Sequence, residues 1–130
     1  MICGALGGLR FLVIECKNGA TTTTIAKRDS DQLAGSMNWF REAYDQSCQP
    51  TPIIVHPALV FDKAASPVPN VRVVDADGLA KIRAELLSYA NAVGALKTMP
   101  TSEQLQAFFA QSNFTREKFV DSFTKSPKRK

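Results

Sequence analysis

A short apolar run that ends in charged residues constrains the fold of this chain more than any other feature. The apolar residues 11–14 are followed at once by Glu15, Cys16 and Lys17. A run that is apolar at successive positions is typical of a strand covered on both faces. Because side chains alternate along a strand, Glu15 and Lys17 are expected on one face and Cys16 on the other, packed inward. The sequence therefore predicts a central strand at residues 10–17 with an acid and a base at its end.

The rest of the chain predicts strands and helices in alternation. The first eight residues are expected to form a turn or a truncated entry to the fold, and Asn18-Gly19 is typical of a tight hairpin. Further strands are expected at residues 21–26, 53–56 and 71–74, and helices at 30–46, from Asp75 or Asp77 to Gly94, at 101–111 and at 115–123. Pro50 and Pro52 are expected to close a linker. The order of strand, helix and strand predicts a βαβ unit and an α/β fold.

Apolar side chains at helical spacing predict which helix faces are buried. The helix that ends at Gly94 carries an apolar stripe, and the two helices after it carry aromatic residues expected to pack inward. These residues are Leu79, Ile82, Leu86, Tyr89 and Val93, then Leu105, Phe108 and Phe109, then Phe119, Val120 and Phe123.

Composition limits the classes of protein to consider. The chain has 130 residues, 45% of them apolar, and its longest apolar run is far too short to cross a membrane. Residues 1–124 hold 12 basic and 12 acidic side chains, so the net charge of +4 comes from residues 125–130. We expect a neutral domain at 1–124 and a basic tail that either contacts phosphates or is a solvated terminus.

The few cysteines and histidines point away from a zinc cluster and from secretion. Three cysteines without paired spacing and one histidine do not form a zinc pattern. The chain shows no secretory leader, so a reducing, cytoplasmic location is expected.

The acid and the base at the end of the first strand suit metal-dependent phosphate chemistry. A carboxylate such as Glu15 can hold Mg²⁺ or Mn²⁺ together with a backbone carbonyl, here that of Cys16. Lys17 would then face the same phosphate and stabilise the charge that develops during attack by water. The alternative interpretation is an exposed ion pair of little energetic value.

The order of these motifs resembles the PD-(D/E)XK, or restriction endonuclease-like, nuclease superfamily. The segment from Phe11 to Asn18, a hairpin and a helix that opens Asp31-Gln32-Leu33 look like that group, as do the later strands to about residue 75. Nuclease-related domain (NERD), type IV restriction and Holliday-junction resolvase members look closest. The resemblance implies a restriction endonuclease-like core, a small mixed sheet flanked by helices, with extra C-terminal helices. It also implies that Glu15 is a metal ligand, Lys17 the catalytic lysine and Gln32 a polar group that faces the same site.

One departure from the superfamily pattern affects the expected site. The superfamily has an aspartate on the strand before Glu-x-Lys, whereas residues 1–14 contain no acidic residue. Three interpretations stay open: the chain lacks its N-terminal part, the second carboxylate comes from Asp29 or Asp31, or the site is degenerate. For both aspartates, favourable interaction with the helix dipole is the simpler role.

The sequence predicts a Mg²⁺-dependent endonuclease that hydrolyses DNA phosphodiester bonds. The alternative is a catalytically inactive nuclease-like domain that binds nucleic acid or a protein partner. DNA is the expected partner, contacted by Lys17 and by the tail residues Lys128, Arg129 and Lys130. No membrane contact is expected, and a homodimer is left open.

Three further side chains are expected to be structural rather than catalytic. Cys16 is interpreted as a buried small hydrophobe, with a thiol-based enzyme as a remote alternative. His56 is interpreted as a buried strand-end histidine whose hydrogen bonds are satisfied. Trp39 could stack on a base, but packing is the preferred interpretation.

Overall fold

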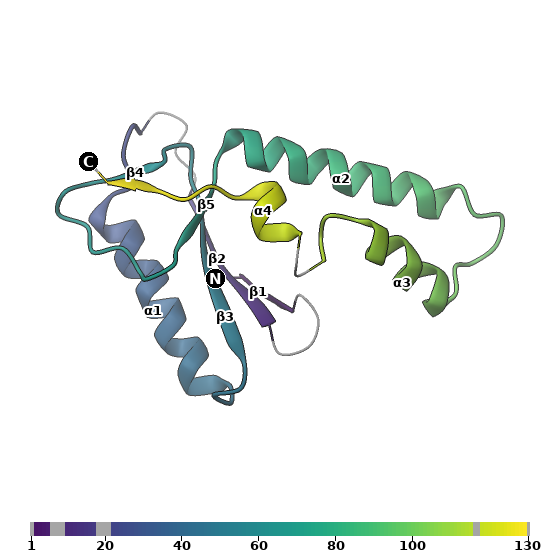
Figure 1. Cartoon of the computed structure of the whole chain (residues 1–130), viewed down its shortest axis with the longest axis horizontal. Coiled ribbons are helices and arrows are strands. Elements are labelled where there is room, and N and C mark those ends of the chain that lie inside the picture. Colours follow the sequence, from purple (N-terminus) through teal and green to yellow (C-terminus); the bar gives the residue numbers. More distant parts are fainter. Residues whose placement is uncertain (1, 6–9, 18–21, 116–117, 130) are drawn as a thin grey trace.

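Four strands form a small mixed sheet at the centre of the molecule (Figure 1). The computed structural model describes residues 2–5, 10–17, 22–115 and 118–129. The sheet order is β1-β2-β3-β5, from β1 (Ile2–Ala5), β2 (Arg10–Cys16), β3 (Gln49–Val55) and β5 (Arg72–Val74). Strands β2, β3 and β5 are parallel, and β1 is antiparallel to β2. The predicted α/β class with a small mixed sheet is confirmed.

Both faces of β2 are covered, as its apolar sequence predicts. On one face Val13 packs in a cluster with Leu33 and Phe40 of α1 (Lys27–Ala43). On the other face Leu12 packs with aromatic side chains of α4 (Phe119–Phe123). Figure 1 shows the sheet between these two helices. The covered strand places the end of β2 at an interface between sheet and helix instead of in open water.

Two prolines lie inside β3, where a linker was expected. Pro50 and Pro52 pair with Phe11 and Val13 in the parallel register of β2 and β3. The N–H of Lys17 donates to the carbonyl of Val55. In a strand, alternate residues direct their backbone groups to opposite sides, so the even-numbered prolines face away from β2. The β5 pairing begins only at Ile53↔Arg72. The missing proline N–H groups therefore interrupt neither ladder.

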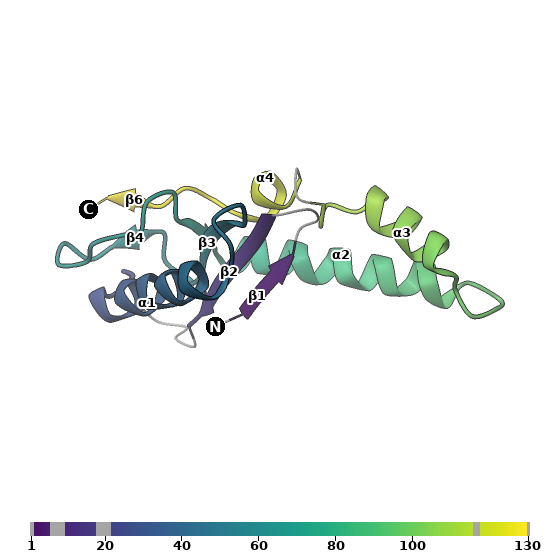
Figure 2. The same cartoon turned by 90° about the horizontal axis from the view of Figure 1, so that it is seen from below.

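Two antiparallel helices extend away from the sheet as an arm, which Figures 1 and 2 show from perpendicular directions. Helix α2 (Ala76–Gly94) is capped by Asp75, and α3 (Ser102–Gln111) is capped by Thr101 in a capping box. Both caps agree with the sequence prediction. The carboxylate of Glu85 accepts the backbone N–H of Asn113, which ties the arm to the segment before α4.

The predicted apolar stripe of α2 is wrong in part. Leu79 and Leu86 are 51% and 54% exposed, because the neighbouring helices cover only the side of α2 that carries Ile82 and Tyr89. In α3, Phe109 is also exposed, whereas Phe108 is half-buried. Of the part of the chain that the structure describes, no helix is both long enough and apolar enough to span a membrane.

The C-terminal residues form part of the fold instead of a free basic tail. Lys125 exchanges backbone hydrogen bonds with Val73, and β6 (Lys128–Arg129) pairs in parallel with β4 (Val60–Phe61). The side chain of Lys125 also lies 2.6 Å from the carboxylate of Asp75. Figure 2 shows β4 and β6 side by side near the start of α1. The expected separation into a domain and a tail therefore does not describe residues 125–129.

Other predicted elements differ from the structure in type or in length. The expected strand at residues 21–26 is absent from the described residues 22–26, where only Ile25 makes an isolated bridge to Phe61. Residues 2–5 form β1, not a turn. The hairpin expected at Asn18-Gly19 lies outside the described residues. Of the helix expected at residues 115–123, the structure has the shorter α4.

Candidate active site

The carboxyl ends of the three parallel strands meet at one edge of the sheet. Cys16 is in register with Val55, and Val55 with Val74. The residues that follow are therefore neighbours along the edge: Lys17, His56 and Asp75. In open α/β sheets this edge is where ligands commonly bind. Asp75 is used to cap α2 and to pair with Lys125, which leaves Lys17 and His56 as the central side chains of the edge.

Glu15 and Lys17 lie on the same face of β2, as the sequence predicts, and α1 covers that face. The hydroxyl of Ser36 donates to Oε1 of Glu15 at 2.5 Å. The ammonium of Lys17 donates to Oε1 of Gln32. Gln32 and Ser36 are four residues apart on α1, so they share one helix face. The structure thus brings together all three residues that were predicted to be catalytic, Glu15, Lys17 and Gln32.

Asp29 joins this group, although the helix-dipole role was the simpler expectation for it and a role as second carboxylate was only one of three open interpretations. Its Oδ1 lies 3.1 Å from Nζ of Lys17, and the residue is only 7% exposed. The same buried oxygen accepts no hydrogen bond from the described residues, so its interaction with Lys17 is mainly ionic. Asp31 instead is exposed and pairs with Lys27 one turn earlier. Of the two candidate carboxylates, only Asp29 belongs to the site.

Glu15 and Asp29 lie at opposite ends of the group. Glu15 contacts Ser36, whereas Asp29 contacts Lys17. Asp29 and Ser36 are seven residues apart on α1, which corresponds to about 10 Å along the helix. Lys17 and Gln32 lie between them. In this arrangement Asp29 is the carboxylate that pairs with Lys17.

His56 closes the group from the side of β3. Its Nε2 lies 3.9 Å from Oδ2 of Asp29 and 3.4 Å from the hydroxyl of Thr22. Its Nδ1 accepts the backbone N–H of Ala58 at 2.9 Å. Burial lowers the pKa of His56 from its ordinary value, and the charge of Lys17 acts in the same direction while Asp29 opposes it. The expectation of a buried, hydrogen-bonded histidine is confirmed.

The side chain of Cys16 is exposed, so the expectation that it packs inward is wrong. Alternation does turn it away from α1. The aromatic residues of α4 that cover Leu12 on that face do not extend to the end of β2. The assigned role of Cys16 uses its backbone carbonyl and is independent of the side chain.

The oxygen atoms at the end of β2 are of the chemical type that a hydrated Mg²⁺ ion binds. The half-buried carboxylate of Glu15 is oriented by Ser36, and the carbonyl of Cys16 follows in the chain. Mg²⁺ usually keeps several waters and binds through one or two carboxylates. No group of three His, Cys, Asp or Glu side chains suitable for a metal occurs among the residues that the structure describes. Glu15 and the Cys16 carbonyl would therefore hold the ion weakly.

The residues that were predicted to contact DNA lie in two places. One is the carboxyl edge of the sheet, and the other is the C-terminal strand β6. Lys17 is a site residue with a side chain 20% exposed. Lys128 is exposed on β6, near the start of α1 (Figure 2), and the backbone of Arg129 belongs to the same strand. Lys130 lies outside the described residues.

Trp39 lies on α1, three residues after Ser36. It is 47% exposed, and its ring meets that of Tyr44 edge-on at 6.2 Å. Packing against Tyr44 therefore accounts for only part of the surface of the Trp39 ring.

Sequence reasoning did not place Asp29, Ser36 or His56 around Lys17. One usable signal was present: Asp29, Gln32 and Ser36 recur at spacings of three and four residues, which is one helix face. The contribution of His56 depends on the register between β2 and β3, which no local pattern in the sequence gives.

Comparisons of the chain with protein-family models, curated proteins and solved structures found no match.

Proposed function

We propose that this chain is a metal-dependent nuclease domain of the restriction endonuclease-like group. The observation that carries the proposal is the position of Glu15 and Lys17. Both project from the carboxyl end of β2 onto one face, where Gln32 contacts the lysine. The parallel β2-α1-β3 unit agrees with the fold that the resemblance implies.

In the proposed reaction, water hydrolyses a DNA phosphodiester bond. When bound at Glu15 and the Cys16 carbonyl, Mg²⁺ would supply Lewis-acid polarisation of the phosphate and a more acidic water. Lys17 would place a positive charge beside the phosphate oxygens, where negative charge increases in the transition state. Gln32 and Asp29 hold the Lys17 ammonium from the α1 side, which reduces the reorganisation needed when the phosphate arrives.

A plasmid-nicking assay with Mg²⁺ or Mn²⁺ tests this proposal. The native chain is expected to nick DNA, and Glu15→Ala and Lys17→Ala are each expected to lower the rate at least a hundredfold. Glu42→Ala and Lys63→Ala are matched controls, because both side chains are exposed and neither contacts the site in the described residues. Activity that survives both site substitutions would assign the catalysis elsewhere.

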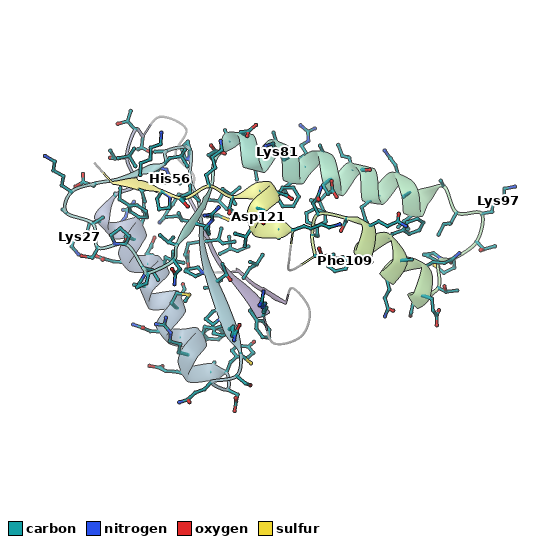
Figure 3. All side chains as sticks on the ribbon, viewed as in Figure 1. Lys27, His56, Lys81, Lys97, Phe109 and Asp121 are labelled. Carbon is teal, nitrogen blue, oxygen red and sulfur yellow. The ribbon has the colours of Figure 1, made fainter. Side chains whose placement is uncertain are left out.

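A second function, nucleic-acid binding without catalysis, has its own supporting observation. Lys17 is already neutralised by Asp29, and the metal-binding set contains one carboxylate. This alternative predicts a salt-sensitive gel shift without cleavage by the native chain. Because β6 pairs with β4, deletion of residues 125–130 would perturb the fold, so the charge reversal Lys128→Glu is the better test. Lys97→Glu, at the far end of the arm (Figure 3), is the control with the same change in net charge.

A further inference from the structure

His56 is fixed beside Lys17 by backbone hydrogen bonds on both of its neighbouring strands. Its own N–H donates to the carbonyl of Val74 at 3.0 Å, and the carbonyl of Val55 accepts the N–H of Lys17 at 3.1 Å. The side chain of His56 is only 3% exposed. Figure 3 shows His56 at the end of the molecule where α1 begins, away from the α2–α3 arm. The imidazole is therefore held in one place in the site.

The hydrogen bond from Ala58 determines which nitrogen of His56 carries the proton. The backbone N–H of Ala58 donates to Nδ1 at 2.9 Å. A backbone N–H can only donate, so Nδ1 must offer a lone pair, and the proton of the neutral ring is on Nε2. The burial that lowers the pKa of His56 favours this neutral form. Nε2–H is thus a fixed donor that points toward Asp29 and Thr22.

The two oxygens of Asp29 have different main neighbours, and Oδ1 also lies 3.8 Å from Nε of the exposed Arg28. Oδ2 lies 3.9 Å from Nε2 of His56, and Oδ1 lies 3.1 Å from Nζ of Lys17. The first distance is longer than a hydrogen bond, so the contact is an electrostatic one between an N–H dipole and a carboxylate. Both groups are largely removed from water, where such a contact is stronger than at the surface.

We propose that His56 is a positioning residue that orients the Asp29 carboxylate and, through it, the ammonium of Lys17. The effect on catalysis rests on the proposed function, whereas the effect on Lys17 itself does not. His56 presents its dipole to Oδ2, which keeps Oδ1 directed at the lysine. With Nδ1 occupied by Ala58 and Nε2 protonated, neither nitrogen has a lone pair for a metal or a substrate proton. His56 is therefore assigned no acid–base step.

Three substitutions of His56 separate this role from simple packing. In His56→Gln the side-chain amide places an N–H near the position of Nε2, whereas the shorter amide in His56→Asn reaches only the position of Nδ1. The first variant keeps a donor toward Asp29, and the second does not. Both remove the ring, and asparagine also fills less volume than glutamine. His56→Met, which is close to glutamine in size but has no N–H donor, separates the two effects: it should behave like His56→Asn if the donor matters and like His56→Gln if only packing matters.

The chemical reactivity of Lys17 provides a readout that does not depend on nuclease activity. The full chain is treated with a limiting amount of an acetylating reagent, and modification of Lys17 is measured by peptide mass spectrometry. Lys27, which pairs with Asp31 at the surface, is the internal reference. Relative to Lys27, Lys17 is expected to react within twofold of the native rate in His56→Gln and at least threefold faster in His56→Asn. Equal reactivity of Lys17 in the two variants would overturn the proposal.

Nicking rates and ¹⁵N spectra complete the experiment. His56→Asn is expected to nick plasmid about tenfold more slowly than His56→Gln. If no form nicks DNA but the Lys17 reactivities differ as expected, the proposed function fails and the positioning role stands. If His56→Asn does not fold, the test is made on the native chain. The ¹⁵N chemical shifts of its imidazole must show a protonated Nε2 and an unprotonated Nδ1. A proton found on Nδ1 would refute the proposal.

Discussion

Lys17 and Asp29 form an ion pair across the interface between β2 and α1, with Nζ 3.1 Å from Oδ1. Their side chains are only 20% and 10% exposed, so both charges are largely removed from water. A pair of this kind contributes little net stability, but removal of one partner leaves an unfavourable buried charge. The pair therefore makes the lysine and the aspartate energetically dependent on one another.

The dependence between Lys17 and Asp29 can be measured with a double-mutant cycle. Lys17→Met should lower the free energy of unfolding by about 2–3 kcal/mol, because the only cation then left beside the buried Asp29 among the described residues is the exposed guanidinium of Arg28, at 3.8 Å. Asp29→Asn should lower it by about 1–2 kcal/mol, since Lys17 is more exposed and can turn to water. The double variant should lose less than the sum, with a coupling of about 1 kcal/mol or more in urea unfolding.

The exposed pair Lys81–Asp77 is the control cycle. Its side chains are 57% and 58% exposed, and the two residues are one turn apart on α2. A coupling of only about 0.3–0.5 kcal/mol is expected there. If both cycles gave the same small coupling, Lys17 and Asp29 would not be a desolvated pair.

Gly78 is required where α2 passes α4. A Cβ at this position would lie 2.3 Å from the backbone carbonyl oxygen of Phe123, and a backbone atom cannot move aside cheaply. Gly78→Ala should therefore destabilise the chain by about 1–3 kcal/mol in thermal or urea unfolding. Gly35→Ala in α1 is the matched control, because a Cβ at Gly35 would meet nothing within 4 Å. That variant should be stabilised by about 0.5–1 kcal/mol, and similar losses in both would contradict the close approach.

Leucines at helical spacing on α1 and α2 should differ in their effect on stability. Leu33 is 1% exposed in the cluster between α1 and the sheet, and Leu33→Ala should cost about 2–5 kcal/mol. Leu86 is 54% exposed, and Leu86→Ala should cost less than about 1 kcal/mol. Urea unfolding of the two variants tests this difference. A large loss in Leu86→Ala would show that α2 has a partner surface.

This contrast shows how far helical spacing predicts packing. The apolar stripe on α1, formed by Leu33, Met37, Phe40 and, at the C-cap, Tyr44, and the stripe on α2 look alike in the sequence, and both helices form close to the expected positions. Leu33 meets the sheet, whereas Leu79 and Leu86 lie on an arm that extends beyond it. Helical periodicity in the sequence indicates only that one face of a helix is apolar. Whether another element covers that face depends on tertiary arrangement.

The candidate site was predictable to the extent that it follows strand geometry. Alternation along β2 placed Glu15 and Lys17 together, and the resemblance to the nuclease superfamily implied that Gln32 faces them. Asp29 was one of two candidates for a second carboxylate, but its contact with Lys17 and the place of His56 were not predicted, because both depend on how α1 and β3 are placed against β2. The basic C-terminal residues looked like a solvated tail because a two-residue strand such as β6 leaves no pattern in the sequence.

The stability of the chain should depend on the protonation of His56 between pH 5.5 and 7.5. Burial lowers the pKa of His56 below its ordinary value of 6.5, so below pH 6.5 the unfolded chain binds a proton that the folded chain does not. The free energy of unfolding should therefore be highest above pH 6.5 and fall as the pH decreases toward the folded-state pKa. The slope cannot exceed about 1.4 kcal/mol per pH unit for one proton.

The variant His56→Gln isolates this contribution, because His56 is the only histidine in the chain. Asp45 and Asp75 have pKa values below their ordinary value of 3.8, the first through hydrogen bonds to Ser47. For Asp75, partial burial opposes the shift, but the hydrogen bonds from Lys125 and Gly78 outweigh it. Both carboxylates thus stay ionised above pH 5.5.

Any other group that titrates in this range cancels in the difference between native and variant. Urea unfolding at pH 5.5, 6.5 and 7.5 should show that the free energy of unfolding falls more at low pH in the native chain than in His56→Gln. If the free energies of the two proteins changed in parallel with pH, His56 would titrate alike in the folded and unfolded chains.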